Sequence, residues 1–279
     1  MLFNSFITHF KTISFVLGFF IKRKHIIGLS NVPSEGPVLL AVNHPNSFLD
    51  AIILACYLDR RVWSLARGDA FKKPLAKRIL SSFYMIPIYR ISEGKEYVGE
   101  NEVTFQKCLS LFRDNQVVLI FSEGICLYQD HLLPLKKGTA RLTQMAWQED
   151  IPLQIVPIGL TYNDYNTFGK NVTIKIGEPI RETAELDKSE TEGIFVKKFN
   201  DFLRIRLEPL ISKPHSVPGT SFQYLLGLLL HFPLYGLLIP FVRKKTHRTV
   251  FYDSVLLALL VVTIVPYWLF LYFILSFLF

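Results

Sequence analysis

The stretch AVNHPNSFLDAII, residues 41–53, decides how the rest of the chain is interpreted. It follows directly from an apolar run of strand type, residues 38–42, and leads into a second apolar run with helical spacing. Pro45 disfavours the helical region for His44, so we expect the imidazole on an extended lip where the strand ends. The first turn of the expected helix carries Asp50. The stretch therefore predicts a strand-turn-helix unit with a histidine and a carboxylate at the turn.

A histidine and an aspartate in this order can act as a base and its orienting partner. The imidazole of His44 would take a proton from a hydroxyl group, while the Asp50 carboxylate fixes its tautomer and stabilises the imidazolium. A structural alternative exists for both residues. Ser47 and Asp50 have the spacing of a capping box with Ser47 as N-cap, and His44 could be an ordinary loop histidine. The spacing alone leaves both interpretations open.

Three further short blocks follow in order along the chain: Met85-Ile86-Pro87-Ile88-Tyr89-Arg90, Phe121-Ser122-Glu123-Gly124 and Ile155-Val156-Pro157-Ile158. Together with Asn43-His44 and Asp50, these blocks resemble the motifs of the phospholipid/glycerol acyltransferase family, whose members acylate glycerol phosphates. The resemblance covers approximately residues 30–165. It is carried by the order and separation of the blocks rather than by any one of them.

This resemblance implies that His44 is the general base and Asp50 its orienting carboxylate. The reaction would move a fatty acyl group from acyl-CoA or acyl-ACP, as co-substrate, to an acceptor hydroxyl. No nucleophilic serine or cysteine and no bound cofactor are expected, since the acceptor hydroxyl attacks the thioester directly. The acceptor would be a glycerol phosphate or lysophospholipid. We favour 1-acyl-glycerol-3-phosphate, with glycerol-3-phosphate or another lysolipid as the alternative.

The remaining site residues concern the acceptor. Arginine binds phosphate in bidentate geometry, which makes Arg90 the first candidate for the acceptor phosphate and Lys136 the second. Arg90 could instead cap a helix or form a surface pair, and Lys136 could be an ordinary loop charge. By resemblance Glu123 lies near the acceptor, or it binds loop amides. Gly124 would allow close backbone approach, and Asn43 would close its loop or donate to an oxyanion.

Two features depart from the common family pattern. Five residues separate His44 from Asp50, where four are usual, and Ile125-Cys126 follows Glu123-Gly124, where threonine and arginine are usual. Both features resemble the branch that includes fungal glycerol-3-phosphate acyltransferases. So does the downstream segment Leu133-Pro134-Leu135-Lys136. The acceptor is therefore less well defined than the reaction.

Strand and helix patterns alternate through the middle of the chain. The expected strands are 37–42, 62–66, 85–89, 117–121, 154–161 and 172–176, and the expected helices are 48–58, 74–84, 96–114, 138–148 and 190–211. Such alternation predicts an α/β fold with a largely parallel sheet flanked by helices. Reactive groups in these sheets gather at the carboxyl ends of strands. His44, Arg90 and Glu123 all follow expected strand ends, which predicts a common cleft.

Apolar segments at both ends suggest three parts: an N-terminal membrane-associated helix (1–24), an α/β acyltransferase domain (25–212) and a C-terminal hydrophobic membrane region (213–279). In the first part the basic cluster follows the apolar run, the reverse of a signal peptide. Its internal polar residues favour an interfacial helix over a clean span, with a buried terminal helix as the alternative. In the last part Pro266 allows one kinked span or two half-helices.

Composition supports a membrane-associated protein. The chain has 279 residues, 50% hydrophobic, with a formal charge of +8 and a mean hydropathy of +0.30. A basic, apolar protein suits an anionic lipid surface, and the positive-inside rule places its catalytic domain on the cytoplasmic side. The sequence lacks nucleic-acid-binding signatures and metal-ligand spacing, so neither nucleic acid nor metal is expected. Its three cysteines are widely spaced, which predicts free thiols.

Two rival functions remain. A thioesterase or lipase would need a nucleophilic serine, but Ser122 lies in Phe-Ser-Glu-Gly rather than in a Gly-x-Ser-x-Gly elbow. A catalytically inactive lipid-binding membrane protein could keep the fold, although it would have no need for His44, Asp50 and Arg90 together. An assay with labelled acyl-CoA separates these functions.

Overall fold

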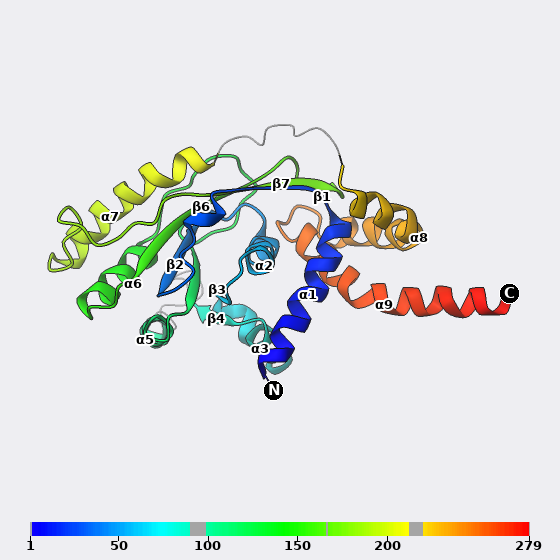
Figure 1. Ribbon diagram of the computed structural model, residues 1–279, viewed down its shortest axis with the longest axis horizontal. Coiled ribbons are helices and arrows are strands. Elements are labelled where there is room, and N and C mark those ends of the chain that lie inside the picture. The colour runs from blue at the N-terminus through cyan, green and yellow to red at the C-terminus, as the bar shows by residue number, and fades with distance from the viewer. Residues whose placement is uncertain (1, 90–98, 166, 212–219, 279) are drawn as a thin grey trace.

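The computed structural model describes residues 2–89, 99–165, 167–211 and 220–278. A curved sheet lies between two layers of helices, and a pair of long helices at the C-terminal end packs beside it (Figure 1). The helices are α1 (Leu2–Phe20), α2 (Ser47–Tyr57), α3 (Pro74–Ser82), α5 (Glu100–Arg113), α6 (Lys137–Gln148), α7 (Glu192–Leu207), α8 (Phe222–Lys245) and α9 (Tyr252–Leu278), with the short 3-10 helices η1 (Leu29–Asn31), η2 (Gly68–Phe71) and η4 (Glu208–Leu210).

Seven strands form one sheet in the order β1-β7-β6-β2-β5-β3-β4. They are β1 (Ile21–Ile27), β2 (Val38–Val42), β3 (Val62–Arg67), β4 (Met85–Ile88), β5 (Val117–Phe121), β6 (Gln154–Tyr162) and β7 (Lys170–Ile176). Strands β2 to β6 run parallel, β7 is antiparallel to β6, and β1 is parallel to β7. The α/β fold with a largely parallel sheet, expected from the sequence, is confirmed.

The central strands are buried on both faces because their sequences are nearly continuous apolar runs. Successive side chains of β2 point to opposite faces of the sheet. Val38 and Leu40 enter a core shared with α1, α2, α8 and α9. Leu39 and Ala41 enter a second core shared with α5, α6 and α7, where Trp147 is fully buried. Because helices cover both faces of the sheet, an active site can form only at the ends of the strands.

Strand β1 was not expected. We expected the N-terminal helical segment to reach residue 24, but α1 ends at Phe20 and residues 21–27 pair with β7. The run IKRKHII hides its strand character behind basic side chains. Charged residues are typical of edge strands, because they discourage pairing with another chain, and β1 is an edge of the sheet. The other expected strands and helices between 37 and 211 are present with shifted ends, and residues 96–98 lie outside the described residues.

The second half of α1 packs into the core. Val16, Leu17 and Phe20 are buried, whereas Phe15 is exposed. This half of the helix agrees with the alternative of a buried terminal helix.

The two C-terminal helices form an antiparallel pair. Helix α9 continues through Pro266, so the described part of the last segment is one helix rather than two half-helices. The indole of Trp268 donates to Nε2 of His231 on α8 at 2.8 Å and stacks on that ring. Polar contacts of this kind hold apolar helices together. Among the described helices, α8 and α9 are long and apolar enough to cross a membrane, judged by length and composition alone.

Candidate active site

The turns that follow β2 and β5 lie side by side. These strands are parallel neighbours, with Val42 opposite Phe121 at their carboxyl ends. The backbone amide of Ser122 donates to the carbonyl oxygen of Val42 at 2.9 Å and continues the pairing past the strand end. The motif residues His44 and Glu123 are thereby brought together. The strand pattern predicted this for His44 and Glu123, whereas Arg90, the third residue of the predicted cleft, lies outside the described residues.

His44 and Asp50 are in direct contact. Nδ1 of His44 lies 2.9 Å from Oδ2 of Asp50, whose side chain is fully buried, while the imidazole is 14% exposed. Phe121 stacks on the imidazole with ring centroids 3.6 Å apart and planes 11° from parallel. Within the described part of the chain, no hydrogen bond engages Nε2 of His44. The ring is therefore fixed at one nitrogen, and the other can take a proton from a bound hydroxyl.

Asp50 accepts two further hydrogen bonds. The hydroxyl of Tyr162 donates to Oδ1 at 2.7 Å, and the backbone amide of Asn46 donates to Oδ2 at 2.7 Å. Complete burial, reinforced by the neighbouring Asp50 carboxylate, raises the pKa of Tyr162 well above its usual range, so the phenol stays a donor. The one carboxylate thus holds the imidazole, the end of β6 and the start of α2.

The capping-box interpretation is wrong in its assignment of the N-cap. Helix α2 has Asn46 as N-cap, and Ser47 is its first residue, with a left-handed φ of 51°. Asp50 nevertheless binds the backbone amide of the N-cap, so its structural contact and its contact with His44 coexist. The backbone amide of Ser47 lies 2.9 Å from Sγ of Cys126, which occupies the position where the family usually has arginine.

Glu123 binds backbone amides on both sides of the site. Oε2 accepts from the amide of His44 at 2.8 Å, and Oε1 accepts from the amide of Leu133 at 2.8 Å and from Nε2 of Gln129 at 3.4 Å. Burial raises the pKa of Glu123, although the two amides oppose this shift. These contacts are those of the loop-amide alternative. They tie the turn after β5 to His44.

Asn43 closes the turn onto β6. Its Nδ2 donates to the carbonyl oxygen of Leu160 at 2.9 Å, and its Oδ1 accepts from the amide of Leu160 at 2.7 Å. These contacts are those of the loop-closing alternative.

Gly124 and Lys136 lie against each other. Gly124 has a left-handed φ of 64°, and a Cβ placed there would come within 2.9 Å of Cγ of Lys136. The amide of Lys136 donates to the carbonyl oxygen of Ser122 at 2.8 Å, and its side chain is exposed. The close backbone approach expected at Gly124 is thus to the stem of Lys136. Arg90, the other cation predicted for the acceptor, lies outside the described residues.

Ser122 does not offer an exposed nucleophile. It is 1% exposed, and its Oγ accepts from the hydroxyl of Thr139 at 3.0 Å. This placement removes the basis for the thioesterase or lipase alternative.

A buried polar cluster behind the turn was not foreseen. Nδ2 of Asn46 donates to Oδ2 of Asp253 at 2.6 Å, and Nζ of Lys170 forms an ion pair with the same oxygen. The side chains of Lys170 and Asp253 are completely buried. Oγ of Ser254 accepts from the amide of Leu49 at 3.2 Å. A single acid at the start of a long apolar run was the available signal for Asp253, and a tyrosine at a parallel strand end was the signal for Tyr162.

Comparisons with known proteins identify the family. The family model described as Acyltransferase matches residues 23–161, which include β2, the His44 turn and most of β6. Among solved structures, the 1-acyl-sn-glycerophosphate (LPA) acyltransferase from Thermotoga maritima is similar at 16% identity, with a TM-score of 0.43, over 66% of this chain and 74% of that one. No curated protein matches the sequence. Through the motif-bearing half that the family model covers, the chain belongs to the acyltransferase family.

Proposed function

We propose that the protein is a membrane-associated O-acyltransferase of glycerophospholipid synthesis. It transfers a fatty acyl group from acyl-CoA or acyl-ACP to the hydroxyl of 1-acyl-glycerol-3-phosphate, within an α/β domain whose sheet begins with β1 at Ile21. The observation that carries this proposal is the contact of 2.9 Å between His44 and the buried Asp50, with the second imidazole nitrogen left for substrate.

In the proposed mechanism His44 acts as general base. The acceptor hydroxyl gives its proton to Nε2 as its oxygen attacks the thioester carbonyl carbon. The tetrahedral intermediate then collapses by breaking the C–S bond, and the imidazolium returns the proton to the leaving thiolate. Asp50 keeps Nδ1 protonated and stabilises the imidazolium, as in other base-and-orienter pairs.

The acceptor phosphate is assigned to Arg90 and Lys136 by resemblance to the family. Lys136 has suitable surroundings, because it sits at the N-terminal end of α6, where the helix dipole also favours an anion. Glu123, Gly124 and Asn43 shape the turns around the acceptor.

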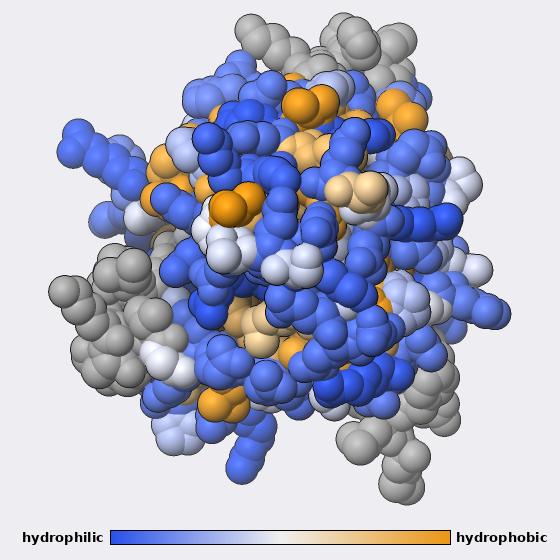
Figure 2. Space-filling model, turned by 90° about the vertical axis from the view of Figure 1, so that its left-hand side faces the viewer, coloured by the Kyte–Doolittle hydropathy of each residue, from blue (hydrophilic) through white to orange (hydrophobic). Residues whose placement is uncertain are grey.

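Membrane association is proposed from the apolar surface of the last two helices. Large exposed apolar side chains line both of them: Phe222, Leu229, Phe232, Leu237 and Phe241 on α8, and Leu269, Phe270, Phe273 and Phe277 on α9. By contrast, the side of the molecule that carries α6 and α7 is mostly hydrophilic (Figure 2). Patches of this extent mark contact with a membrane or a partner.

The ends of α8 constrain how the membrane is engaged. At its start, the amide of Ser221 donates to the carbonyl oxygen of Lys22 on β1 at 3.0 Å. Near its end, Val242 is completely buried in the core that α8 shares with β2, and at the start of α9 Asp253 binds Asn46 of the catalytic turn. Both ends therefore rest on the α/β domain, so α8 lies along the membrane surface instead of crossing it. The outer half of α9 reaches into the bilayer, with the catalytic domain on the cytoplasmic side.

A second candidate is glycerol-3-phosphate 1-O-acyltransferase. It is favoured by the five-residue gap and by the segment Leu133–Lys136. In this segment the amide of Leu133 donates to Glu123, and the amide of Lys136 donates to the carbonyl oxygen of Ser122. The segment therefore borders the site.

The test compares acceptors with purified protein in detergent or vesicles. Labelled acyl-CoA should acylate 1-acyl-glycerol-3-phosphate faster than glycerol-3-phosphate at matched concentrations. The reverse ranking moves the assignment to the first acylation step without changing the role of His44. If the protein transfers no acyl group to either of these acceptors and none to any other lysolipid, the proposed function is contradicted and the inactive lipid-binding alternative is supported.

A further inference from the structure

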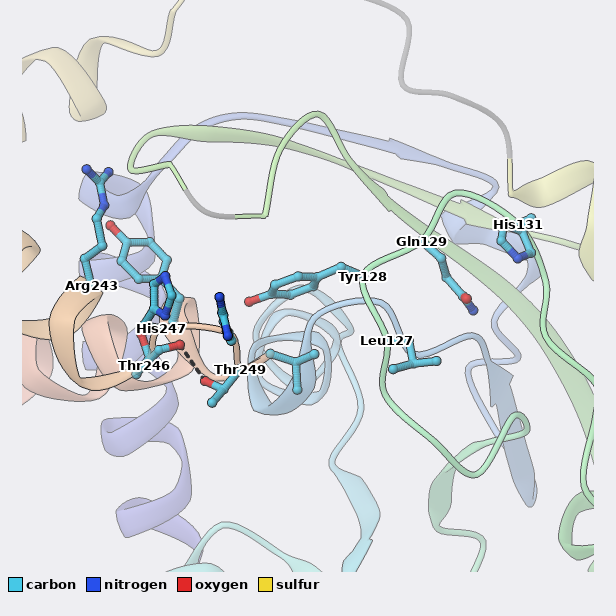
Figure 3. Close-up of a pocket in the computed structure, with 11 residues that line it drawn as sticks. Leu127, Tyr128, Gln129, His131, Arg243, Thr246, His247 and Thr249 are labelled. Atoms are coloured by element: carbon cyan, nitrogen blue, oxygen red, sulfur yellow. Dashed lines mark hydrogen bonds between the residues drawn. The ribbon is translucent and has the colours of Figure 1, made fainter.

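A large open pocket lies between the catalytic loops and the turn that joins α8 to α9. Its volume is about 740 Å³, and it is lined by Leu127, Tyr128, Gln129 and His131 on one side and by residues in and beside the turn on the other. Figure 3 shows Tyr128 projecting from its loop toward the turn that carries Thr246, His247 and Thr249. A pocket of this size accommodates a small-molecule headgroup.

The turn side of this pocket is basic. Arg243, His247 and Arg248 line it, and no described lining residue is acidic. Arg243 has the hydroxyl of Tyr252 as its hydrogen-bond partner. In the described part of the chain, neither Arg243 nor Arg248 forms an ion pair with a carboxylate. Two arginines that form no ion pair with a described carboxylate therefore line an open cavity.

The opposite wall adds a neutral donor. Burial, reinforced by the carboxylate of Asp253, raises the pKa of Tyr128, so its phenol stays protonated. On the turn itself, the hydroxyls of Thr246 and Thr249 donate to backbone carbonyls at 2.8 Å, which braces the turn. Arg248 holds a left-handed φ of 62°, a conformation that residues other than glycine rarely adopt. The turn is thus a fixed platform for its basic side chains.

The pocket adjoins the reaction centre. Leu127, on its wall, donates from its amide to the carbonyl oxygen of His44 at 3.3 Å. Gln129 contacts Glu123, and Tyr252 immediately precedes Asp253, the partner of Asn46. A ligand in the pocket would therefore be separated from the catalytic turn by a single layer of residues.

We infer that this pocket is a phosphate-binding subsite for the acyl-transfer reaction, with Arg243 and Arg248 as its cations. The inference rests on the proposed function and extends it to a segment outside the residues that match the family. Guanidinium groups bind phosphate oxygens in bidentate geometry, and the turn lies where the apolar helices would meet the membrane surface. The phosphate could belong to the glycerol phosphate acceptor or to the carrier of the acyl donor.

The kinetic test uses two double variants of the same turn. Arg243→Ala/Arg248→Ala removes the two lining arginines, while Lys244→Ala/Lys245→Ala removes the same charge from positions that do not line this pocket. The arginine variant should raise the KM of one substrate at least about tenfold. The control should stay within about twofold, as expected for solvated surface charges. A raised acceptor KM assigns the pocket to the acceptor, and a raised donor KM assigns it to the carrier.

A second measurement separates attraction to an anionic membrane from binding of substrate. Vesicle sedimentation measures how much of each variant binds to vesicles of phosphatidylcholine alone and to vesicles with added phosphatidylserine. Equal effects of the two double variants on KM overturn the inference. So does a loss by the arginine variant of binding to phosphatidylserine vesicles alone, because the turn would then serve only as a lipid-surface contact.

Direct binding keeps this test independent of turnover. Isothermal titration with glycerol 3-phosphate and with coenzyme A should show at least about tenfold weaker binding of one probe to the arginine variant than to the lysine control. This result would support the subsite even if the protein transferred no acyl group. Failure of both probes to bind the unmodified protein, or equal weakening in both variants, would overturn it.

Discussion

Asn46, in the turn that carries His44, and Asp253, at the start of α9, are joined by a buried hydrogen bond of 2.6 Å across 207 residues of sequence. The backbone amide of Asn46 also binds Asp50, the carboxylate that contacts His44. Asn46 alone therefore bridges Asp50 and the C-terminal helix α9. Lys170 neutralises Asp253 inside the protein. The C-terminal hairpin, for which contact with the membrane is proposed, is thus also part of the support of the site.

The first prediction concerns this support. Asp253→Ala should destabilise the protein by about 3–5 kcal/mol, because it leaves the charge of Lys170 buried without a partner. Lys170→Met/Asp253→Leu should recover most of that loss, since apolar residues of similar volume often replace a buried ion pair at little cost. Thermal unfolding in detergent measures both.

Measurements of kcat and KM show whether the Asn46–Asp253 contact positions the site or only stabilises the fold. The double variant still lacks the acceptor for Asn46, so its kcat should stay below that of the unmodified protein although its stability has recovered. KM values should change little. Full recovery of kcat would show that the Asn46–Asp253 contact does not position the catalytic turn.

A second prediction addresses the base and its partners. His44→Ala should lower kcat by about 10²–10⁴-fold while the protein remains folded and membrane-bound. Asp50→Asn should cost less, since the geometry can survive although stabilisation of the imidazolium does not. Tyr162→Phe should cost least, because it removes one of several contacts to Asp50. A turnover near the unmodified level for His44→Ala contradicts the base assignment.

Whether a contact could be predicted from the sequence depends on how far apart its two residues lie along the chain. His44 and Asp50 are six residues apart, and the parallel strands are local apolar runs, so both leave a readable pattern. Tyr162 meets Asp50 across 112 residues, and Asp253 meets Asn46 across a still longer separation. Pairs of this kind have no period and no fixed spacing. They exist only because the sheet order places β6 beside β2 and because α9 returns to α2.

The prediction for the residues of β1 was wrong for a different reason. The inner charges of β1 are those of an edge strand, and they resemble the basic flank of a membrane helix. Local composition therefore favoured the wrong assignment. The pairing with β7, which decides the matter, is again a long-range contact.

The third prediction retains the role of Arg90 from the sequence. Arg90→Ala should raise the acceptor KM by an amount equivalent to about 1.5–3 kcal/mol, the cost of a lost charge-assisted contact. The donor KM should change less. An effect confined to the donor, measured with acyl-CoA at saturating acceptor, contradicts the phosphate role.

A fourth prediction uses the pKa of Glu123. Burial raises this pKa in the folded state, so the folded protein holds its proton more tightly than the unfolded chain does. The contribution to stability is therefore fully present below the usual glutamate pKa of about 4.3 and is lost as pH rises through the raised value. Glu123→Gln should be less stable throughout, because its amide group faces a backbone donor, but this pH-dependent loss should disappear.

The measurement for Glu123 is unfolding free energy against pH, compared with the exposed control Glu185→Gln. The difference between unmodified protein and Glu123→Gln should shrink as pH rises through the window, whereas the control should run parallel to the unmodified protein. Parallel curves for both variants contradict the raised pKa.

The last prediction concerns orientation at the membrane. A helix that crosses a bilayer places its ends on opposite sides, but both ends of α8 rest on the same α/β domain. Ser221 at its start binds Lys22, and Val242 near its end is buried in the core. Single cysteines introduced at Gln223 and at His247 should therefore be labelled from the same side, which the basic clusters at residues 22–24 and 243–248 place in the cytoplasm. Membrane-impermeant maleimide should modify neither site in intact cells and both sites in lysed cells or inverted vesicles. Labelling of one site alone in intact cells would mean that α8 crosses the bilayer, which would require its contacts with the domain at one end to break. Labelling of both in intact cells would leave α8 along the surface and reverse the face on which the domain lies.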